Sequence, residues 1–287
     1  MKKQQPLLFC VGFGDTARAL AQLKAKQGWK IAATSRSPET VKALCEEGIE
    51  GLLFDETLPD KVPESAAWLI STPPDENGCP AYNLLHSAAQ NAAQQKCSIF
   101  YLSTTGVYGD LGGGWAFEWT QTNPQSTAGQ RRDDAEKAWR SISADVTLVR
   151  LPGIYGPGRS AFDRLREGKA RRIIKDGQVF SRVHVDDIAA CLNGAIEKGV
   201  RGEVLHPCDD APAPPQHVIA YAAELLGVEV PPDIPFEEAG LSPMAQRFYS
   251  ECKRISNART KSLTGWRPAY PDYQSGLQAI RATENQA

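Results

Sequence analysis

The sequence has almost no net charge, no long apolar run and no paired-cysteine motif, and each absence excludes a class of protein. Its 287 residues carry a formal net charge of −2, so neither nucleic acid nor a membrane surface is indicated as a partner. No apolar stretch is long enough to cross a bilayer. The seven cysteines are scattered without a Cys-x-x-Cys pair, and we expect them to be reduced and mostly buried in a cytoplasmic protein. His206 and Cys208 have no second ligand pair in the sequence, so no metal site is expected.

Apolar, strand-like segments alternate with helical segments through the first half of the chain. This alternation predicts an α/β fold, a Rossmann-type doubly wound parallel sheet with helices on both faces. Strands are expected at residues 7–11, 29–34, 51–54, 68–71, 98–103 and 146–151, with helices at 16–27, 40–47, 82–95 and 133–141. Beyond Pro152 the pattern loosens. It predicts a helix at 162–170, a strand at 179–185, and helices at 187–197 and 215–226 among clusters of proline.

The stretch that organises the chain is the glycine-containing turn after the first predicted strand, with the spacing Gly12-x-Gly14-x-x-Ala17. Glycine permits a tight turn and lets the backbone approach a diphosphate, and N–H groups at the following helix start then point at the anion. The residues predicted to contact a dinucleotide here are Gly12, Phe13, Gly14, Thr16 and Ala17. Asp15 argues against this interpretation, because its charge would repel phosphates unless the side chain turns away to cap the helix.

The end of the second predicted strand is where a dinucleotide site distinguishes NAD from NADP. An acidic residue there favours NAD, whereas an arginine accommodates the phosphate of NADP. This chain has Ser35, Arg36 and Ser37 in that window and no acid. The window favours NADP, with NAD as the alternative, unless Arg36 is only a solvated loop residue. Asp55, after the third strand, is either a partner of the adenine amino group or an ordinary turn aspartate.

Parallel sheets bind ligands at the carboxyl ends of their strands. Further residues at those ends are therefore assigned to the cofactor, namely Ser71, Thr72, Ser103 and Pro152. We expect residues 1–155 to form an NAD(P)-binding Rossmann domain that residues 179–210 rejoin. Residues 156–178 and 211–287 are expected to form a small, partly interleaved substrate lobe.

Several segments together resemble the extended short-chain dehydrogenase/reductase family, the NAD(P)-dependent sugar-nucleotide epimerases and dehydratases. They are the glycine turn, residues 103–109 and 150–159 after the fifth and sixth strands, residues 182–187 and the closing segment 253–268. The likeness covers almost the whole chain, and the short glycine turn is similar to that of the family's atypical branch. It implies a nicotinamide cofactor and a polar small-molecule substrate.

The resemblance also implies a proton relay, from which this chain departs. In the family a Ser or Thr after strand five acts with a Tyr-x-x-x-Lys pair, in which the lysine lowers the pKa of the tyrosine. Thr104 matches the hydroxyl. Aligning Gly129 and Glu136 with the family pattern places Ala128 at the tyrosine and Arg132 at the lysine. Alanine cannot transfer a proton, and Arg132 can hold ribose hydroxyls but cannot act as an acid or base.

Other residues at the same sheet edge are candidates for the missing proton donor and for the substrate site. Tyr108, Tyr155 and His184 are candidate donors, although each also has a structural explanation because its short motif is present in family members with an intact Tyr/Lys pair. The residues predicted to contact the substrate are Thr105, Arg159 and Arg182. The two arginines would hold an anionic group or form surface salt bridges.

Three functions are compatible with these residues. The first is an NADP-dependent oxidoreductase or epimerase with a non-standard proton donor, acting on a sugar-nucleotide-like or other polar small molecule. The second is a catalytically silent NADP(H)-binding sensor or regulator. The third is a relic whose glycine turn binds nothing. A homodimer through the predicted helices at 82–95 and 133–141 is a further expectation.

Overall fold

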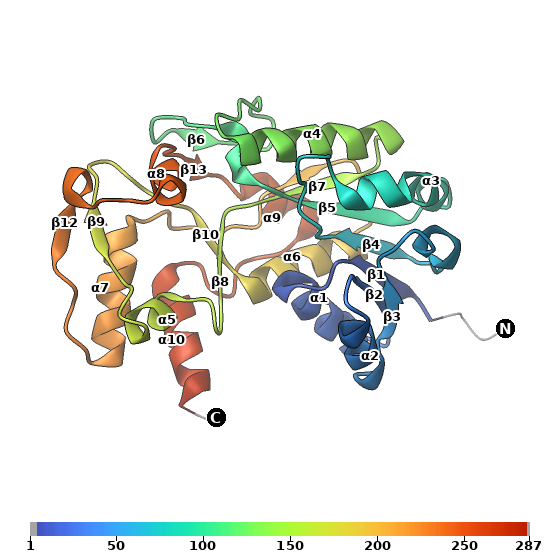
Figure 1. Ribbon diagram of the computed structural model, residues 1–287, viewed down its shortest axis with the longest axis horizontal. Helices are drawn as coiled ribbons and strands as arrows, with labels where there is room; N and C mark the ends of the chain where they lie inside the picture. Colours follow the sequence, from blue (N-terminus) through green and yellow to red (C-terminus); the bar gives the residue numbers. More distant parts are fainter. Residues whose placement is uncertain (1–4, 286–287) are drawn as a thin grey trace.

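The computed structural model describes residues 5–285, with a seven-stranded parallel sheet at its centre (Figure 1). The strands are β1 (Leu7–Val11), β2 (Lys30–Ser35), β3 (Glu50–Leu53), β4 (Ala67–Ile70), β5 (Ser98–Thr104), β7 (Thr147–Leu151) and β11 (Val204–Leu205). Their order is β3-β2-β1-β4-β5-β7-β11. The direction of strand addition reverses between β1 and β4, the position at which doubly wound sheets bind ligands. The predicted α/β fold is confirmed.

Helices cover both faces of the sheet because alternate residues of each strand point to opposite sides. One face carries α1 (Asp15–Lys26), α2 (Pro38–Glu46) and α6 (Val185–Glu197), and the other carries α3 (Pro80–Gln94) and α4 (Thr127–Ile142) (Figure 1). On β1, Leu8 packs with the α1 and α6 layer, whereas Phe9 packs with the α3 and α4 layer. Every residue of β1 is buried, which explains its uninterrupted apolar sequence. Each such side chain contributes about 1.5–3 kcal/mol to stability.

The remaining elements lie mainly beside the sheet, on the side away from the amino terminus (Figure 1). Three short strand pairs are parallel, joining β8 (Gly153–Tyr155) to β10 (Arg182–His184), β9 (Arg172–Ile174) to β12 (Asp233–Pro235), and β6 (Trp115–Ala116) to β13 (Arg254–Ile255). Helices α5 (Ala161–Arg166), α7 (Pro215–Leu226) and α10 (Tyr273–Glu284) share a core around Phe162. The other helical elements are η1 (Leu58–Lys61), η2 (Thr105–Tyr108), η3 (Phe236–Glu238), α8 (Pro243–Tyr249) and α9 (Ala258–Thr264).

Three predicted elements differ from the structure by more than two residues at one end. The strand expected at 179–185 is confined to β10 and pairs with β8, because Phe180 instead exchanges backbone hydrogen bonds with Ala213. The strand that returns to the main sheet is β11. Helix α4 begins at Thr127 rather than at 133, because the Ser126 hydroxyl accepts a hydrogen bond from the Gly129 N–H and caps it. Helix α5 ends at Arg166 rather than at 170, shortly before Gly168 in the left-handed region.

Candidate functional site

The glycine turn leaves backbone exposed at the point where the strand order reverses. Gly12 has φ +87°, and a Cβ there would lie 2.7 Å from the Ser71 hydroxyl oxygen, so only glycine fits. Its N–H donates to the Thr34 hydroxyl at 2.8 Å. Gly14 is different, because no atom lies within 4 Å of where its Cβ would be. It stands at the N-cap of α1 without a side-chain cap. The first N–H groups of α1 are therefore available to an anion.

The residues around the turn hold it in place. Thr16 and Ala17 are buried in the first turn of α1. The half-buried Phe13 packs on the α1 layer, and the Arg18 guanidinium lies 5.0 Å from the centre of its ring. The Ser71 hydroxyl donates to the Val11 carbonyl at 3.3 Å, which joins the ends of β1 and β4.

Two hydroxyls at this edge have no protein partner. The Thr72 and Ser103 hydroxyl oxygens are buried and make no hydrogen bond within residues 5–285. An unsatisfied buried hydroxyl costs about 1–3 kcal/mol, which a polar ligand would offset. An open backbone cradle beside two unpaired hydroxyls fits a nicotinamide dinucleotide. Pro152, also assigned to the cofactor, lies between β7 and β8.

At the end of β2, one of the three predicted phosphate contacts is left without a partner. Arg36 is exposed and makes no hydrogen bond or ion pair with the part of the chain that the structure describes. Ser37 caps α2, since its hydroxyl accepts from the Thr40 N–H at 3.2 Å and donates to Glu39 at 2.5 Å. Ser35 accepts from the Ser37 N–H at 3.2 Å. Of the three residues, Arg36 is therefore the one whose charged side chain is free to bind a phosphate.

Asp55 has the geometry of a turn residue. Its Oδ1 accepts from both the N–H and the hydroxyl of Thr57, at 2.9 and 2.7 Å. These hydrogen bonds lower the pKa of the carboxyl group. Contact with an adenine amino group stays a prediction.

At the two positions of the family's Tyr/Lys pair, the alanine is exposed and the arginine is bonded to other parts of the protein. Ala128 is exposed in the first turn of α4. One guanidinium nitrogen of Arg132 donates to the Leu102 carbonyl at 2.6 Å and to the Tyr101 hydroxyl at 3.3 Å, which ties α4 to β5. The Thr104 oxygen accepts from the Gly106 N–H at 3.1 Å and caps η2. Because that oxygen accepts in this bond, its hydrogen is still available to a substrate.

Two of the three candidate proton donors, Tyr155 and His184, form hydrogen bonds with other parts of the protein. The Tyr155 hydroxyl donates to the Asp272 carbonyl at 3.4 Å, and a Cβ at Gly276 would lie only 2.0 Å from that hydroxyl. Burial raises the pKa of Tyr155. His184 caps α6, where its Nδ1 accepts from the Asp186 N–H at 3.2 Å. Burial lowers the pKa of His184, although neighbouring carboxylates oppose the shift. Both side chains therefore have a structural role.

Tyr108 belongs to a buried polar network that the sequence did not predict. Arg150 forms an ion pair with Glu136 at 2.6 Å and donates to the Tyr108 hydroxyl at 2.8 Å. That hydroxyl lies 2.6 Å from Nε2 of His206, whose Nδ1 lies 2.9 Å from the Ser256 carbonyl. Since Nδ1 must donate to the carbonyl, Nε2 of a neutral His206 is an acceptor, and the tyrosine hydroxyl has two acceptors within reach, Nε2 and the Phe117 carbonyl at 3.1 Å.

Burial sets the protonation states in this network. It raises the pKa of Tyr108 to about 12. Burial, aided by the nearby Arg150 cation, lowers the pKa of His206 to about 4. Both groups are thus neutral at pH 7, and the network holds η2 in place. No local sequence pattern indicates this network, because its residues are far apart in the chain.

The three predicted substrate residues lie in different surroundings. Thr105 is buried at the start of η2. Arg182 donates from one nitrogen to the carbonyls of Phe180 and Ala213, at 2.8 and 2.9 Å. Nearby, burial raises the pKa of the Asp209 carboxyl to about 8, against the opposing effect of Arg182. Arg159 instead reaches the glycine turn, with Nη1 3.9 Å from Oδ2 of Asp15.

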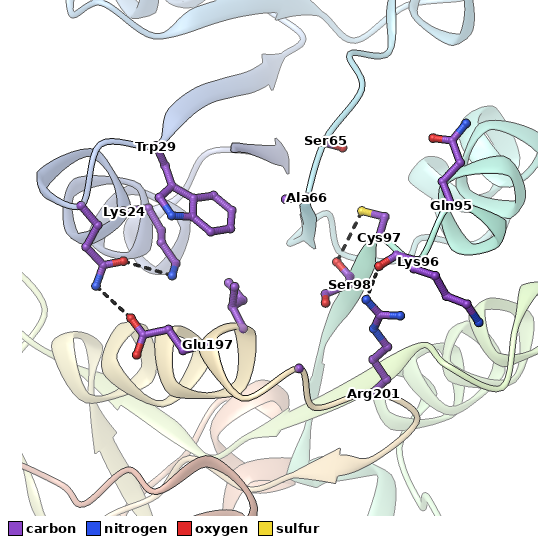
Figure 2. A pocket seen from close by; sticks show the side chains of 13 residues that line it. Lys24, Trp29, Ser65, Ala66, Gln95, Lys96, Cys97, Ser98, Glu197 and Arg201 are labelled. Atoms are coloured by element: carbon purple, nitrogen blue, oxygen red, sulfur yellow. Dashed lines mark hydrogen bonds between the residues drawn. The ribbon is translucent and has the colours of Figure 1, made fainter. Parts of the chain in front are cut away.

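A cavity of about 450 Å³ lies at the opposite edge of the sheet, among the ends of α1, α3 and α6 (Figure 2). Lys24 donates to Oε1 of Gln27 at 3.1 Å, and its ammonium lies 4.5 Å from the centre of the Trp29 ring. Arg201 donates to the Lys96 carbonyl. Because helix carboxyl ends carry partial negative charge, these cations stabilise the helix ends. The chemistry predicted from the sequence is at the other edge.

Neither a metal site nor a membrane-spanning helix is present among the described residues. Within residues 5–285 no group of three or more His, Cys, Asp or Glu side chains is placed to bind a metal. None of the helices described there has both the length and the apolar character needed to cross a membrane.

Comparisons with known proteins agree with the fold. The family model described as the RmlD substrate binding domain matches residues 7–213. A dTDP-4-dehydrorhamnose reductase from Mycobacterium tuberculosis (strain CDC 1551 / Oshkosh) is 28% identical over 174 residues, 58% of this chain and 53% of that protein. The chain thus spans about half the length of the curated relatives it matches.

Two solved structures are similar over nearly the whole chain. A conserved protein of unknown function from Silicibacter pomeroyi DSS is 44% identical, with a TM-score of 0.89 and coverage of 98% of this chain and 99% of that one. The human epimerase family protein SDR39U1, solved with NADPH, is 17% identical, with a TM-score of 0.73 and coverage of 96% and 99%. The second likeness shows the fold alone. Together with the family match, these findings confirm the resemblance to extended short-chain dehydrogenases/reductases.

Proposed function

The chain belongs to the RmlD substrate-binding domain family, and from this premise we propose that it is an NADP(H)-binding oxidoreductase or epimerase. Its substrate is a sugar-nucleotide-like or other polar small molecule, and its proton donor is not the usual tyrosine. The observation that carries the proposal is the cradle at the end of β1, where Gly12 packs against Ser71 and the space above Gly14 is open. When bound, the nicotinamide would supply or accept the hydride.

The chain's own residues support specific roles around that ligand. The Gly12–Gly14 backbone and the start of α1 would hold the diphosphate, and the unpaired hydroxyls of Thr72 and Ser103 would bind polar groups of the nucleotide. Arg36 would hold the 2′-phosphate, because its guanidinium is uncommitted. Thr104 would orient the substrate with the hydrogen that its capping bond leaves available. Arg132 would at most add a contact to the ribose, since one of its nitrogens is bonded to Leu102.

A catalytically silent NADP(H) sensor is the alternative, and one observation favours it. The two positions that would carry the proton relay hold Ala128, which is exposed, and Arg132, which ties α4 to β5. Neither side chain can exchange a proton at pH 7.

The division into a nucleotide-binding part and a substrate lobe stays a prediction, as does a cytoplasmic location. Dimerisation through α3 and α4 also stays a prediction. The two helices lie side by side, and the Tyr82 and Trp139 rings meet edge to face at 5.6 Å between centroids.

Calorimetric titration with NADPH and NADH tests the proposal. We expect NADPH to bind roughly ten-fold or more tightly than NADH, a difference of about 1.4 kcal/mol. Arg36→Ala should remove most of that preference and leave NADH binding unchanged. Absence of binding by either nucleotide would eliminate both the enzyme and the sensor.

A restored relay distinguishes the enzyme from the sensor. The variant Ala128→Tyr with Arg132→Lys replaces both missing groups, and Ala128→Phe with Arg132→Lys is the matched control without the hydroxyl. If the pocket accepts a substrate, the tyrosine variant should oxidise NADPH with a panel of keto-sugar nucleotides at least ten-fold faster than the control. Equal, negligible rates in both variants would favour the sensor.

A further inference from the structure

An exposed ion pair joins the glycine turn to the loop after β8. Asp15, the first residue of α1, directly follows Gly14, whose Cβ position is open to solvent. Arg159 approaches it from a distant part of the chain, with 3.9 Å between Nη1 and Oδ2. The arginine that sequence reasoning assigned to the substrate therefore stands beside the predicted diphosphate cradle.

The backbone that carries Arg159 is fixed by a tight turn. Gly156 and Arg159 exchange backbone hydrogen bonds of 3.3 and 3.1 Å, and Gly158 between them has φ +71°. A Cβ at Gly156 would lie 2.8 Å from a methyl group of Val185, so the turn sits against the start of α6. The backbone of Arg159 is therefore fixed, whereas its long side chain allows the guanidinium to change position.

The pair itself is weak. The two side chains are 63% and 72% exposed, and an exposed ion pair of this kind contributes about 0–1 kcal/mol. A diphosphate offers a guanidinium two charged oxygens and a bidentate geometry, which is a stronger partner. Without a nearby cation, the Asp15 carboxylate would oppose any anion at the start of α1.

We propose that Arg159 is a ligand of the cofactor diphosphate and that in the free protein it pairs weakly with Asp15. When the nucleotide binds, the guanidinium neutralises Asp15 and pairs with the phosphates above Gly14. This deepens the proposed function, on which it rests, and replaces the substrate role for Arg159. It also removes the objection that Asp15 raised against the glycine turn.

A double-mutant cycle tests the assignment, using NADPH titrated into the wild type, Asp15→Asn, Arg159→Gln and the double variant. Arg159→Gln should weaken NADPH binding by roughly ten-fold or more, and Asp15→Asn should strengthen it a few-fold. In the Asp15→Asn background, Arg159→Gln should still weaken binding. If the effect of Arg159→Gln disappears in that background, Arg159 serves only to neutralise Asp15 and the phosphate contact is overturned.

Two controls isolate the diphosphate. Lys169→Gln also removes one positive charge, at a residue after α5 that pairs with Glu167 at 2.9 Å, and should leave NADPH affinity within two-fold of the wild type. Adenosine 2′-monophosphate lacks the diphosphate and should bind the wild type and Arg159→Gln equally. Wild-type binding of NADPH with no change in Arg159→Gln would overturn this inference alone. No binding of NADPH by the wild type would overturn the proposed function as well.

Discussion

The two sides of the candidate site differ in how their polar groups are used. At the ends of β1, β4 and β5, the Thr72 and Ser103 hydroxyls and the first N–H groups of α1 have no side-chain partner in the described chain. Around η2, α4 and β8, the corresponding groups of Thr104, Arg132 and Tyr155 are bonded to backbone. An unsatisfied buried hydroxyl reduces stability unless a ligand pairs with it, so the Thr72 and Ser103 hydroxyls are candidates to bind polar groups of a ligand, whereas Thr104, Arg132 and Tyr155 already have protein partners.

The largest effect is expected at the glycine turn. A valine at Gly14 meets no atom within 4 Å of its Cβ in the free protein but would occupy the space of the diphosphate. Gly14→Val should therefore lower NADPH affinity by at least about 100-fold, or about 2.7 kcal/mol, at a cost of roughly 1 kcal/mol in unfolding free energy.

Gly12→Ala is the contrast for that measurement. Its positive φ and the 2.7 Å approach to Ser71 should destabilise the protein even without nucleotide, as thermal melting would show. Equal NADPH affinity for Gly14→Val and the wild type would contradict the assignment of the cradle.

The buried Tyr108–His206 network, on the η2 side of the site, should make the stability of the protein sensitive to acid. The pKa of His206 is lowered to about 4 by burial, below its ordinary value of about 6.5. Its contribution is therefore fully present above pH 6.5 and is lost as the pH falls toward 4. The loss should reach about 3 kcal/mol at most.

Urea unfolding at pH 7 and pH 4.5 measures this contribution as the difference between the wild type and His206→Gln. The variant should be less stable at pH 7 and lose less stability in acid. If the His206 imidazole, identified by the NMR signal that His206→Gln lacks, titrates near pH 6.5 in the folded protein, the buried, neutral histidine is refuted.

Smaller effects are expected from removing either of two neighbouring hydroxyls, those of Ser103 and Thr104. Ser103→Ala removes an unpaired buried oxygen, so the free protein should be unchanged or more stable by about 1 kcal/mol, while NADPH binding weakens a few-fold. Thr104→Ala removes the cap of η2 and should cost about 1 kcal/mol of stability with less effect on NADPH. Thermal melts and titrations of both variants give the comparison, and a reversed pattern would show that the unpaired hydroxyl faces no ligand.

The parts of the fold that could be predicted from sequence are those set by local pattern. β1 was predicted at its observed bounds because all five of its residues are apolar and a glycine turn follows. The start of α4 was missed because its first turns are polar, and the Ser126 cap decides where it begins. The extent of β10 depends on the distant Phe180–Ala213 pairing, which no local pattern encodes.

The candidate site divides in the same way. Gly12 and Gly14 follow from the need for backbone close to an anion, so their spacing predicts the role proposed for them. The partner of Arg159 could not be predicted, because it depends on how the loop after β8 returns toward α1. The contacts of Arg132 and Tyr108 likewise depend on packing between segments that are far apart in the chain.

A crystal structure of the protein grown with saturating NADPH tests most directly whether the glycine turn binds the cofactor. The diphosphate should lie over the Gly12–Gly14 turn and the 2′-phosphate at Arg36, and the Thr72 and Ser103 hydroxyls should form hydrogen bonds with the nucleotide or its waters. A structure in which the turn holds no nucleotide, or in which NADPH occupies only the cavity at the opposite edge of the sheet, would contradict this prediction.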